Sequence, residues 1–200
     1  MAVGKTAVVR YIETHAPYVH ISYEDNRDVL EEIRRRGLIK TRYEDYLEIQ
    51  KLWLEKEIRH WEKAESYPCT IMDFGAEEIE FYTLHYPRTI GENWEVEEPL
   101  RKELEAVKRC FPDRILFLDA SDSVLRQRKE RDRTRSREFF EHHLKYLLPM
   151  KREWFFHMDC VDVLNTDNMT CEETGAYVKA WIDANLSGAV SPLYTDAKKN

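Results

Sequence analysis

Hydrophobic residues are distributed in two patterns along this chain of 200 residues. Short runs rich in β-branched and aromatic residues predict strands, and longer stretches with apolar residues three or four positions apart predict helices that bury one face. The predicted strands lie at 18–23, 70–72, 114–119 and 161–165. The third of them is almost continuously apolar, which is typical of a parallel strand covered on both faces.

The stretches between these strands carry helical periodicity and helix start and stop signals. Thr41 and Glu44 predict a capping box at the start of a long helix. Pro87 is expected to end one helix and Pro149 to bend another. The predicted helices cover 7–12, 28–36, 42–64, 77–86, 100–110, 139–154 and 172–185, and a further helix follows Ser121-Asp122.

Strands that alternate with helices predict βαβ units, and therefore an α/β fold with a mostly parallel sheet and helices on both of its faces. Ligands of such sheets bind at the carboxyl ends of the strands. Polar residues follow each predicted strand at that end, namely Glu24-Asp25, Asp73, Asp119–Ser121 and Asn165-Thr166. We expect a single domain over 1–187 and a flexible tail over 188–200.

Composition narrows the classes of function. The net charge of −7 argues against a general nucleic-acid binder and against attraction to an acidic membrane surface. Neither a signal peptide nor an apolar run of about 18 residues is present, so we expect a cytoplasmic protein. The four cysteines are far apart and form no C-x-x-C pair, which predicts reduced, mostly buried thiols and neither a zinc site nor a disulfide framework.

The first residues carry half of a chemical motif. Gly4-Lys5-Thr6 is the second half of a phosphate-binding loop, G-x-x-x-x-G-K-[ST]. In that loop backbone N–H groups wrap the phosphates, the lysine reaches the β- and γ-phosphates, and the hydroxyl holds Mg²⁺. The helix that follows would direct its N-terminal N–H groups at the anion. The candidate ATP-binding residues are therefore Val3, Gly4, Lys5, Thr6 and Ala7.

The first half of this loop would lie upstream of Met1. Three explanations remain open: an internal methionine taken as the start, a degenerate loop, and a chance G-K-T in an N-terminal tail with a solvated Lys5.

Two carboxylates are candidates for catalysis. Asp73 ends a buried strand and is, with Thr6, a candidate ligand of Mg²⁺. Glu24 follows a different strand and is a candidate base that accepts the proton of a substrate hydroxyl. For both, capping of a turn or helix is the alternative. Asp73-Phe74-Gly75 also matches a protein-kinase signature, but no H-R-D loop accompanies it and the chain is too short for that fold.

Arginines are concentrated between residues 126 and 137. Guanidinium groups pair with phosphate oxygens and stabilise the charge of a phosphoryl-transfer transition state. Arg128 and Arg131 are three positions apart, share a helix face, and are the candidate phosphate ligands and catalytic groups. The alternative is a solvated basic face.

Together these residues resemble the P-loop nucleoside and nucleotide kinases, in particular the deoxynucleoside kinase and thymidylate kinase group. The resemblance is carried by residues 2–6, Asp73, the block 117–121 and the arginine-rich segment that follows Leu125. It implies a three-layer αβα fold around a five-stranded parallel sheet of order 2-3-1-4-5. It also implies ATP with Mg²⁺ as the phosphate donor and an arginine-rich lid over about residues 126–138.

The resemblance carries several roles over to this chain: binding of donor phosphate and metal by Lys5 and Thr6, lid arginines at Arg128 and Arg131, and the general base at Glu24. Deoxynucleoside kinases usually have Glu-Arg-Ser or Asp-Arg-Ser at the end of the third strand, where this chain has Asp73-Phe74-Gly75. This departure leaves the phosphate acceptor open.

The central strand of that family would precede the loop and is the one that this sequence lacks. We therefore expect about ten more residues upstream in the native protein, the length of a short strand plus the first half of the loop. A chain that starts at Met1 is expected to be poorly stable or weakly active.

Three functions fit these observations. The first is transfer of the γ-phosphate of ATP to a nucleoside, nucleotide or similar small molecule. The second is the same transfer to an antibiotic or metabolite hydroxyl, and the third is a nucleotide-binding regulatory module with little catalysis. Trp53 and Tyr82 are candidates for stacking on a planar substrate, with core packing as the alternative. No nucleic-acid or membrane partner is expected, and the aromatic helix over 42–64 is a candidate homodimer face.

Overall fold

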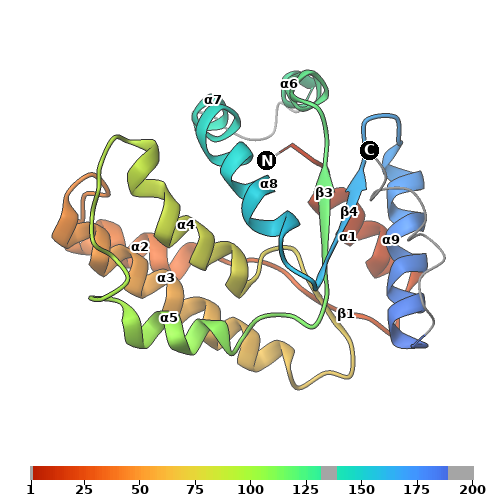
Figure 1. Cartoon of the computed structure of the whole chain (residues 1–200). Coiled ribbons are helices and arrows are strands. Elements are labelled where there is room, and N and C mark those ends of the chain that lie inside the picture. The colour runs from red at the N-terminus through yellow and green to blue at the C-terminus, as the bar shows by residue number, and fades with distance from the viewer. Residues whose placement is uncertain (1, 132–138, 189–200) are drawn as a thin grey trace.

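The computed structural model of the protein describes residues 2–131 and 139–188, and these have an α/β fold (Figure 1). Strand β1 (His20–Ser22) pairs in parallel with β2 (Thr70–Met72), and β3 (Ile115–Asp119) pairs in parallel with β4 (Val161–Asn165). Within the described residues no strand joins β2 to β3, so the strands form two separate pairs. The coarse prediction of a parallel α/β fold is confirmed, whereas a single five-stranded sheet is not formed by these residues.

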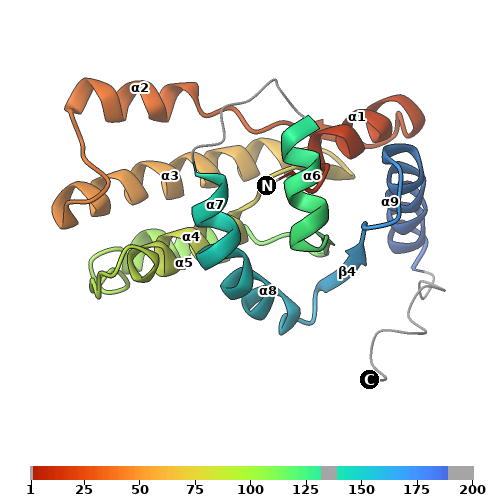
Figure 2. The ribbon, with the colours of Figure 1, turned by 90° about the horizontal axis from the view of Figure 1, so that it is seen from above.

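Helices separate the strands along the chain, as the periodicity predicts. In both views α3, α4 and α5 lie together on the side of the strands away from α9 (Figures 1 and 2). No helix of the described residues is long and apolar enough to cross a membrane. The helices are α1 (Lys5–His15), α2 (Arg27–Arg36), α3 (Tyr43–Ala64), α4 (Ala76–Thr89), α5 (Arg101–Lys108), α6 (Asp122–Arg131), α7 (Phe140–His142), the π-helical segment η1 (His143–Leu147), α8 (Leu148–Phe156) and α9 (Cys171–Leu186).

Strand β3 is covered on both faces, as its apolar run predicts. Leu116 and Leu118 pack against the cluster formed by α1 and α9, whose members include Ile12 and Trp181. Phe117 points to the other face and packs in the cluster of α4, α7 and α8. This alternation is the two-residue period of a strand. Since Ile21 and Ile71 of the other strand pair also pack against α1 and α9, these two helices hold both pairs in one layer.

The predicted capping box at Thr41 and Glu44 is wrong. Helix α3 begins at Tyr43, and no side chain caps its N-terminus. Asp45 instead accepts a hydrogen bond from the backbone N–H of Ile39 at 2.9 Å, which ties the preceding loop to the first turn. A capping box does form at α9, where the side chain of Thr170 accepts from the N–H of Glu173 and the carboxylate of Glu173 accepts from the N–H of Thr170.

The prediction that Pro87 ends a helix is also wrong, because α4 continues through it to Thr89. Proline has no N–H for the carbonyl four residues earlier, which here belongs to Thr83. That carbonyl accepts the hydroxyl of Tyr46 at 2.9 Å instead. The side chain of a neighbouring helix therefore replaces the missing hydrogen bond, a contact that the local sequence does not reveal.

Where a bend at Pro149 is expected, the structure has a π-helical segment just upstream of the proline. The π-helical segment η1 precedes α8, and Pro149 falls in the first turn of α8, where a missing N–H is tolerated best. All four cysteines are free thiols, as predicted, but Cys110 is the one that is fully buried.

Candidate functional site

One cavity, of about 1640 Å³, lies between the two strand pairs and is lined by β2 and β3. Every residue that the sequence predicts for phosphate binding, catalysis or metal binding lines it. These residues are Val3, Gly4, Lys5, Thr6, Ala7, Glu24, Asp73, Arg128 and Arg131. Residues that are up to 128 positions apart in the sequence, from Val3 to Arg131, therefore border the same cavity.

The N-terminus of α1 is uncapped and electropositive. Gly4 precedes the helix with φ of 100°, in the left-handed region that favours glycine. No side chain caps the helix, and its first turn holds no acidic residue. The first N–H groups of a helix lack partners within it, and the helix dipole adds positive charge at this end. Because Gly4, Lys5 and Thr6 line the cavity, this positive end borders it.

Lys5 lies among carboxylates. Its Nζ donates to Oε2 of Glu78 at 3.0 Å and lies 5.7 Å from the centre of the Phe74 ring. Burial lowers the pKa of Lys5, and the charges of Asp73, Glu24 and Glu77 act in the opposite direction. The first two of these carboxylates are the ones that the sequence predicted.

Glu24 and Asp73 meet because β1 and β2 are neighbours. The backbone N–H of Glu24 donates to Oδ1 of Asp73 at 3.1 Å. Asp73 does not cap α4, whose N-cap is Gly75 without a side-chain cap, so the helix-cap alternative fails for Asp73. The carboxylate of Glu24 accepts the side-chain amide of Asn26 at 2.7 Å, which orients it at the end of β1.

Sequence reasoning missed Glu78 and Lys151. The two carboxylate oxygens of Glu78 bind two lysines, with Oε2 accepting from Lys5 and Oε1 from Lys151. Burial lowers the pKa of Lys151 well below its usual value, and the nearby charge of Lys5 lowers it further. One signal was available: Lys151 lies three residues after Leu148 and four before Phe155, both buried, and so occupies a core position of its helix.

Glu77 was missed as well. It is 93% buried, since its exposed fraction is 7%, and its Oε2 has no hydrogen-bond partner among the described residues. Burial raises the pKa of Glu77. A Cβ at Gly75 would meet Oε2 of Glu77 at 2.4 Å, so glycine is needed at that position for the carboxylate to approach. Glu77 adds a buried carboxyl group to this cavity, and in its protonated form such a group can donate a hydrogen bond to a ligand.

The structure describes only the first part of the arginine-rich segment. Arg128 spans from α6 to the loop after β4, where it donates to Oγ1 of Thr166 at 2.9 Å and to the carbonyl of Thr166 at 2.5 Å. Arg131 ends α6 and lines the cavity. Arg126 pairs with Glu141. Residues 132–138, most of the predicted lid, lie outside the described residues.

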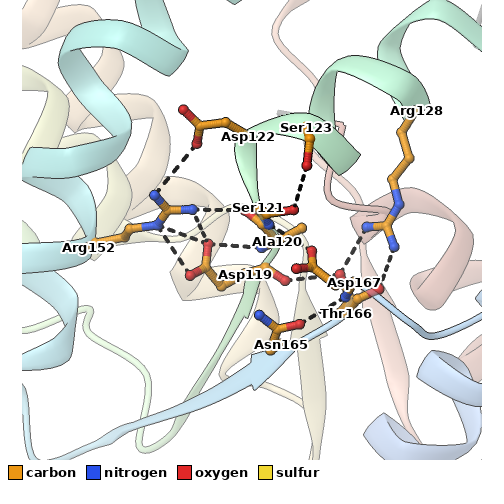
Figure 3. A network of polar contacts seen from close by, with 10 residues as sticks. All are labelled: Asp119, Ala120, Ser121, Asp122, Ser123, Arg128, Arg152, Asn165, Thr166 and Asp167. Atoms are coloured by element: carbon orange, nitrogen blue, oxygen red, sulfur yellow. Dashed lines mark hydrogen bonds and ion pairs between the residues drawn. The ribbon is translucent and has the colours of Figure 1, made fainter.

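The polar residues that follow β3 and β4 form a framework (Figure 3). Arg152 donates to both oxygens of Asp119 and, at 2.8 Å, to the carbonyl of Ala120. The carbonyl of Asp119 accepts the N–H of Thr166 at 2.8 Å, which closes the network toward Arg128. Asp119 is thus held by Arg152 at the end of β3, whereas Glu24 and Asp73, near Lys5, follow the other strand pair.

The two candidate stacking residues lie in different parts of the fold. Trp53 packs in the core of α3, α4 and α5. Tyr82 lines the cavity, stacks on Phe74 with an interplanar angle of 8° and a centroid distance of 6.5 Å, and contacts Nδ1 of His143 at 3.4 Å. Two parallel rings therefore lie beside the lysines.

The described residues include no group of three or more His, Cys, Asp or Glu side chains arranged for a metal. Mg²⁺, however, takes one or two protein oxygens and completes its shell with phosphate and water. The hydroxyl of Thr6 and the carboxylate of Asp73 are hard oxygen donors in the same cavity, so their chemistry fits this ion.

No protein-family model matches the chain, and no curated protein matches it either. The functional argument therefore rests on the residues of the cavity.

Proposed function

We propose that the protein is an ATP-dependent phosphotransferase that moves the γ-phosphate to a nucleoside, nucleotide or similar small molecule. The observation that carries this proposal is the arrangement around Lys5: an uncapped helix N-terminus, a lysine and acidic side chains share one cavity with Arg128 and Arg131. Phosphoryl transfer needs positioned reactants and compensated charge more than covalent chemistry, and these groups supply both.

Each group has a distinct role in this proposal. The N–H groups at the start of α1 and Nζ of Lys5 bind the donor phosphates. Glu24 accepts the proton of the acceptor hydroxyl as that oxygen attacks phosphorus. Arg128 and Arg131 stabilise charge on the transferred group. Thr6 and Asp73 would hold Mg²⁺, which neutralises phosphate charge when it is bound. A cytoplasmic location belongs to the same proposal.

The proposal extends to the sheet. The edges of β2 and β3 border the same cavity, and Ala2 and Val3 lie in its wall. A further parallel strand between them would join the two strand pairs into one sheet with the order β1, β2, further strand, β3, β4. This is the order 2-3-1-4-5 of the P-loop kinases, in which the further strand is strand 1. Such a strand, leading into Ala2, would also supply the first half of the phosphate loop and satisfy the backbone groups of both edges.

The two parallel rings of Phe74 and Tyr82 favour an acceptor with a planar ring over an aliphatic hydroxyl compound. A nucleotide-binding regulatory module is the second candidate. Lys5 is paired with Glu78, and a paired lysine is less able to stabilise charge during phosphate transfer, which favours a module that binds a nucleotide without catalysis.

Calorimetry with ATP·Mg²⁺ tests the proposal, on this chain and on a chain extended upstream by a strand and the first half of the loop. We expect binding, tighter in the extended chain, and its loss in Lys5→Ala. A screen of nucleosides and nucleotides for phosphate transfer then separates the two candidates. Binding without transfer to any acceptor would favour the regulatory module, and absence of binding in both chains would overturn the phosphate-loop assignment.

A further inference from the structure

Helices α1, α4 and α8 bring two lysines onto one buried carboxylate. Glu78 stands in the first turn of α4, Lys5 begins α1, and Lys151 lies within α8. The exposed fraction of the side chain is 11% for both Glu78 and Lys151. Each lysine takes a different oxygen of the carboxylate, so the two ammonium groups lie on either side of one small anionic group.

We propose that Lys151 is a second phosphate-binding lysine, and that Glu78 holds Lys151 and Lys5 at the spacing that a phosphoryl group spans. The inference rests on the proposed function, because it places the phosphate at Lys5. The occupant of the site is a phosphoryl group that is bound by both lysines and replaces the carboxylate of Glu78 between them.

The charges favour this exchange. Glu78 is the carboxylate that both lysines bind directly, while Asp73, Glu24 and Glu77 act on Lys5 without an ion pair to it. Glu78 and Lys151 are mostly buried, and Coulomb attraction is stronger there than in water. A phosphoryl group presents several oxygens on one atom, as a carboxylate does, and carries more negative charge. It can therefore satisfy both lysines at once without rearrangement of the three helices.

Two neighbours support a ligand at this point. Glu77, the adjacent residue, is a buried carboxyl group with an oxygen that lacks a partner within the described residues. In its protonated form it can donate to a phosphate oxygen. The ring of Tyr82 lies 5.5 Å from Nζ of Lys151, so the planar stacking surface and the second lysine are adjacent. The anion and a planar acceptor would thus lie side by side.

The test measures binding of inorganic pyrophosphate by calorimetry at constant ionic strength. Lys151→Met keeps the apolar stem and removes the charge. We expect it to weaken binding roughly tenfold to a hundredfold, the loss for one hydrogen bond to a charged group, and Lys5→Met to have a similar effect. Lys145→Met removes an exposed lysine of η1, which precedes α8, and should change nothing.

Glu78→Gln separates the inference from a purely structural role. It removes the anion that the lysines share, so we expect a lower melting temperature in anion-free buffer, tighter pyrophosphate binding, and a larger thermal shift on addition of pyrophosphate. If Glu78 is only part of a structural ion pair, the variant is less stable and pyrophosphate does not bind it more tightly, which would overturn the inference.

The outcomes also distinguish this inference from the proposed function. Pyrophosphate binding that needs Lys5 but not Lys151 would refute the second lysine alone. Absence of pyrophosphate binding to the unmodified chain would refute the phosphate site itself. If Lys151→Met does not fold, Lys151→Arg, which keeps the charge, serves in its place. We expect Lys151→Arg to retain pyrophosphate binding. If Glu78→Gln, added to Lys151→Arg, weakens that binding more than tenfold, the result counts against the proposed exchange.

Discussion

The backbone N–H of Glu24 donates to the carboxylate of Asp73 at 3.1 Å, across a sequence separation of 49 residues. This contact exists because β1 and β2 run in parallel and end at the same edge. It fixes one oxygen of Asp73 and brings both carboxylates beside Lys5. The contact shows how a strand pair of only three residues each positions the acidic part of the candidate site.

Asp73→Asn should reduce phosphoryl transfer about a hundredfold, because it removes the charge of a proposed ligand of Mg²⁺ and so weakens the compensation of phosphate charge that the transfer requires. The amide oxygen of asparagine can still accept the N–H of Glu24, so the fold should be preserved. Steady-state kinetics with the best acceptor, together with thermal unfolding, would measure both effects. Asp25→Asn is the matched control, because Asp25 is exposed and paired with Arg27. Unchanged transfer in Asp73→Asn would mean that Asp73 has no catalytic role.

Gly4→Ala should weaken ATP binding and cost roughly 1–2 kcal/mol of stability, the penalty of an L-residue in a left-handed conformation. A Cβ at this position meets nothing within 4 Å, so the expected cost is conformational and not a clash. Gly37→Ala is a close control, because Gly37 also has a positive φ, of 65°, and equally open surroundings, but ends α2. Urea unfolding should show similar losses in the two variants, and calorimetry should show weaker ATP binding in the first alone.

Protonation of His143 should destabilise the protein in acid. Burial lowers the pKa of His143 to about 3, whereas the unfolded chain retains the ordinary value of 6.5. The unfolded state therefore binds one more proton as the pH falls from 6.5 toward 3, and this contribution to stability is fully present above 6.5. In this range the free energy of unfolding falls by about 1.4 kcal/mol for each unit that the pH decreases, which is the effect of one proton.

Urea unfolding at several pH values checks this prediction. In His143→Gln that part of the slope should disappear, while His157→Gln, which changes an exposed histidine, should retain it. An identical pH profile in the wild-type chain and in His143→Gln would contradict the assignment.

Tyr46→Phe should cost about 1–3 kcal/mol, because it leaves the carbonyl of Thr83 without the hydroxyl that stands in for the N–H of Pro87. Tyr43→Phe removes an exposed hydroxyl from the same helix and should cost less. The free energy of unfolding of the two variants is the direct measurement. The rate of hydrogen exchange at the end of α4 should also rise in Tyr46→Phe. An unchanged rate there would refute the conclusion that the hydroxyl of Tyr46 replaces the missing N–H of Pro87.

Local pattern was sufficient for the elements themselves. The apolar runs at 114–119 and 161–165 predict β3 and β4 because a buried strand needs apolar side chains on both faces. Helix α9 forms where the periodicity over 172–185 predicts it, and the side chain of Thr170 satisfies an N–H that the helix leaves unpaired. Parallel strands end at the same edge of a sheet, so the polar residues that follow them are expected to lie near one another. The site residues predicted on this basis line the cavity. Their chemical roles remain predictions.

Tertiary structure alone decided the contacts between elements. Lys151 and Glu78 are separated by 73 residues, and neither belongs to a short motif, so only the packing of α8 against α4 joins them. Pro87 continues a helix because Tyr46 of another helix supplies the missing donor, and Asp119 is bound by Arg152 of α8. The sequence determines where chains become helices and strands, since that depends on neighbours within a few residues. Which charges meet in a buried place depends on how those elements pack.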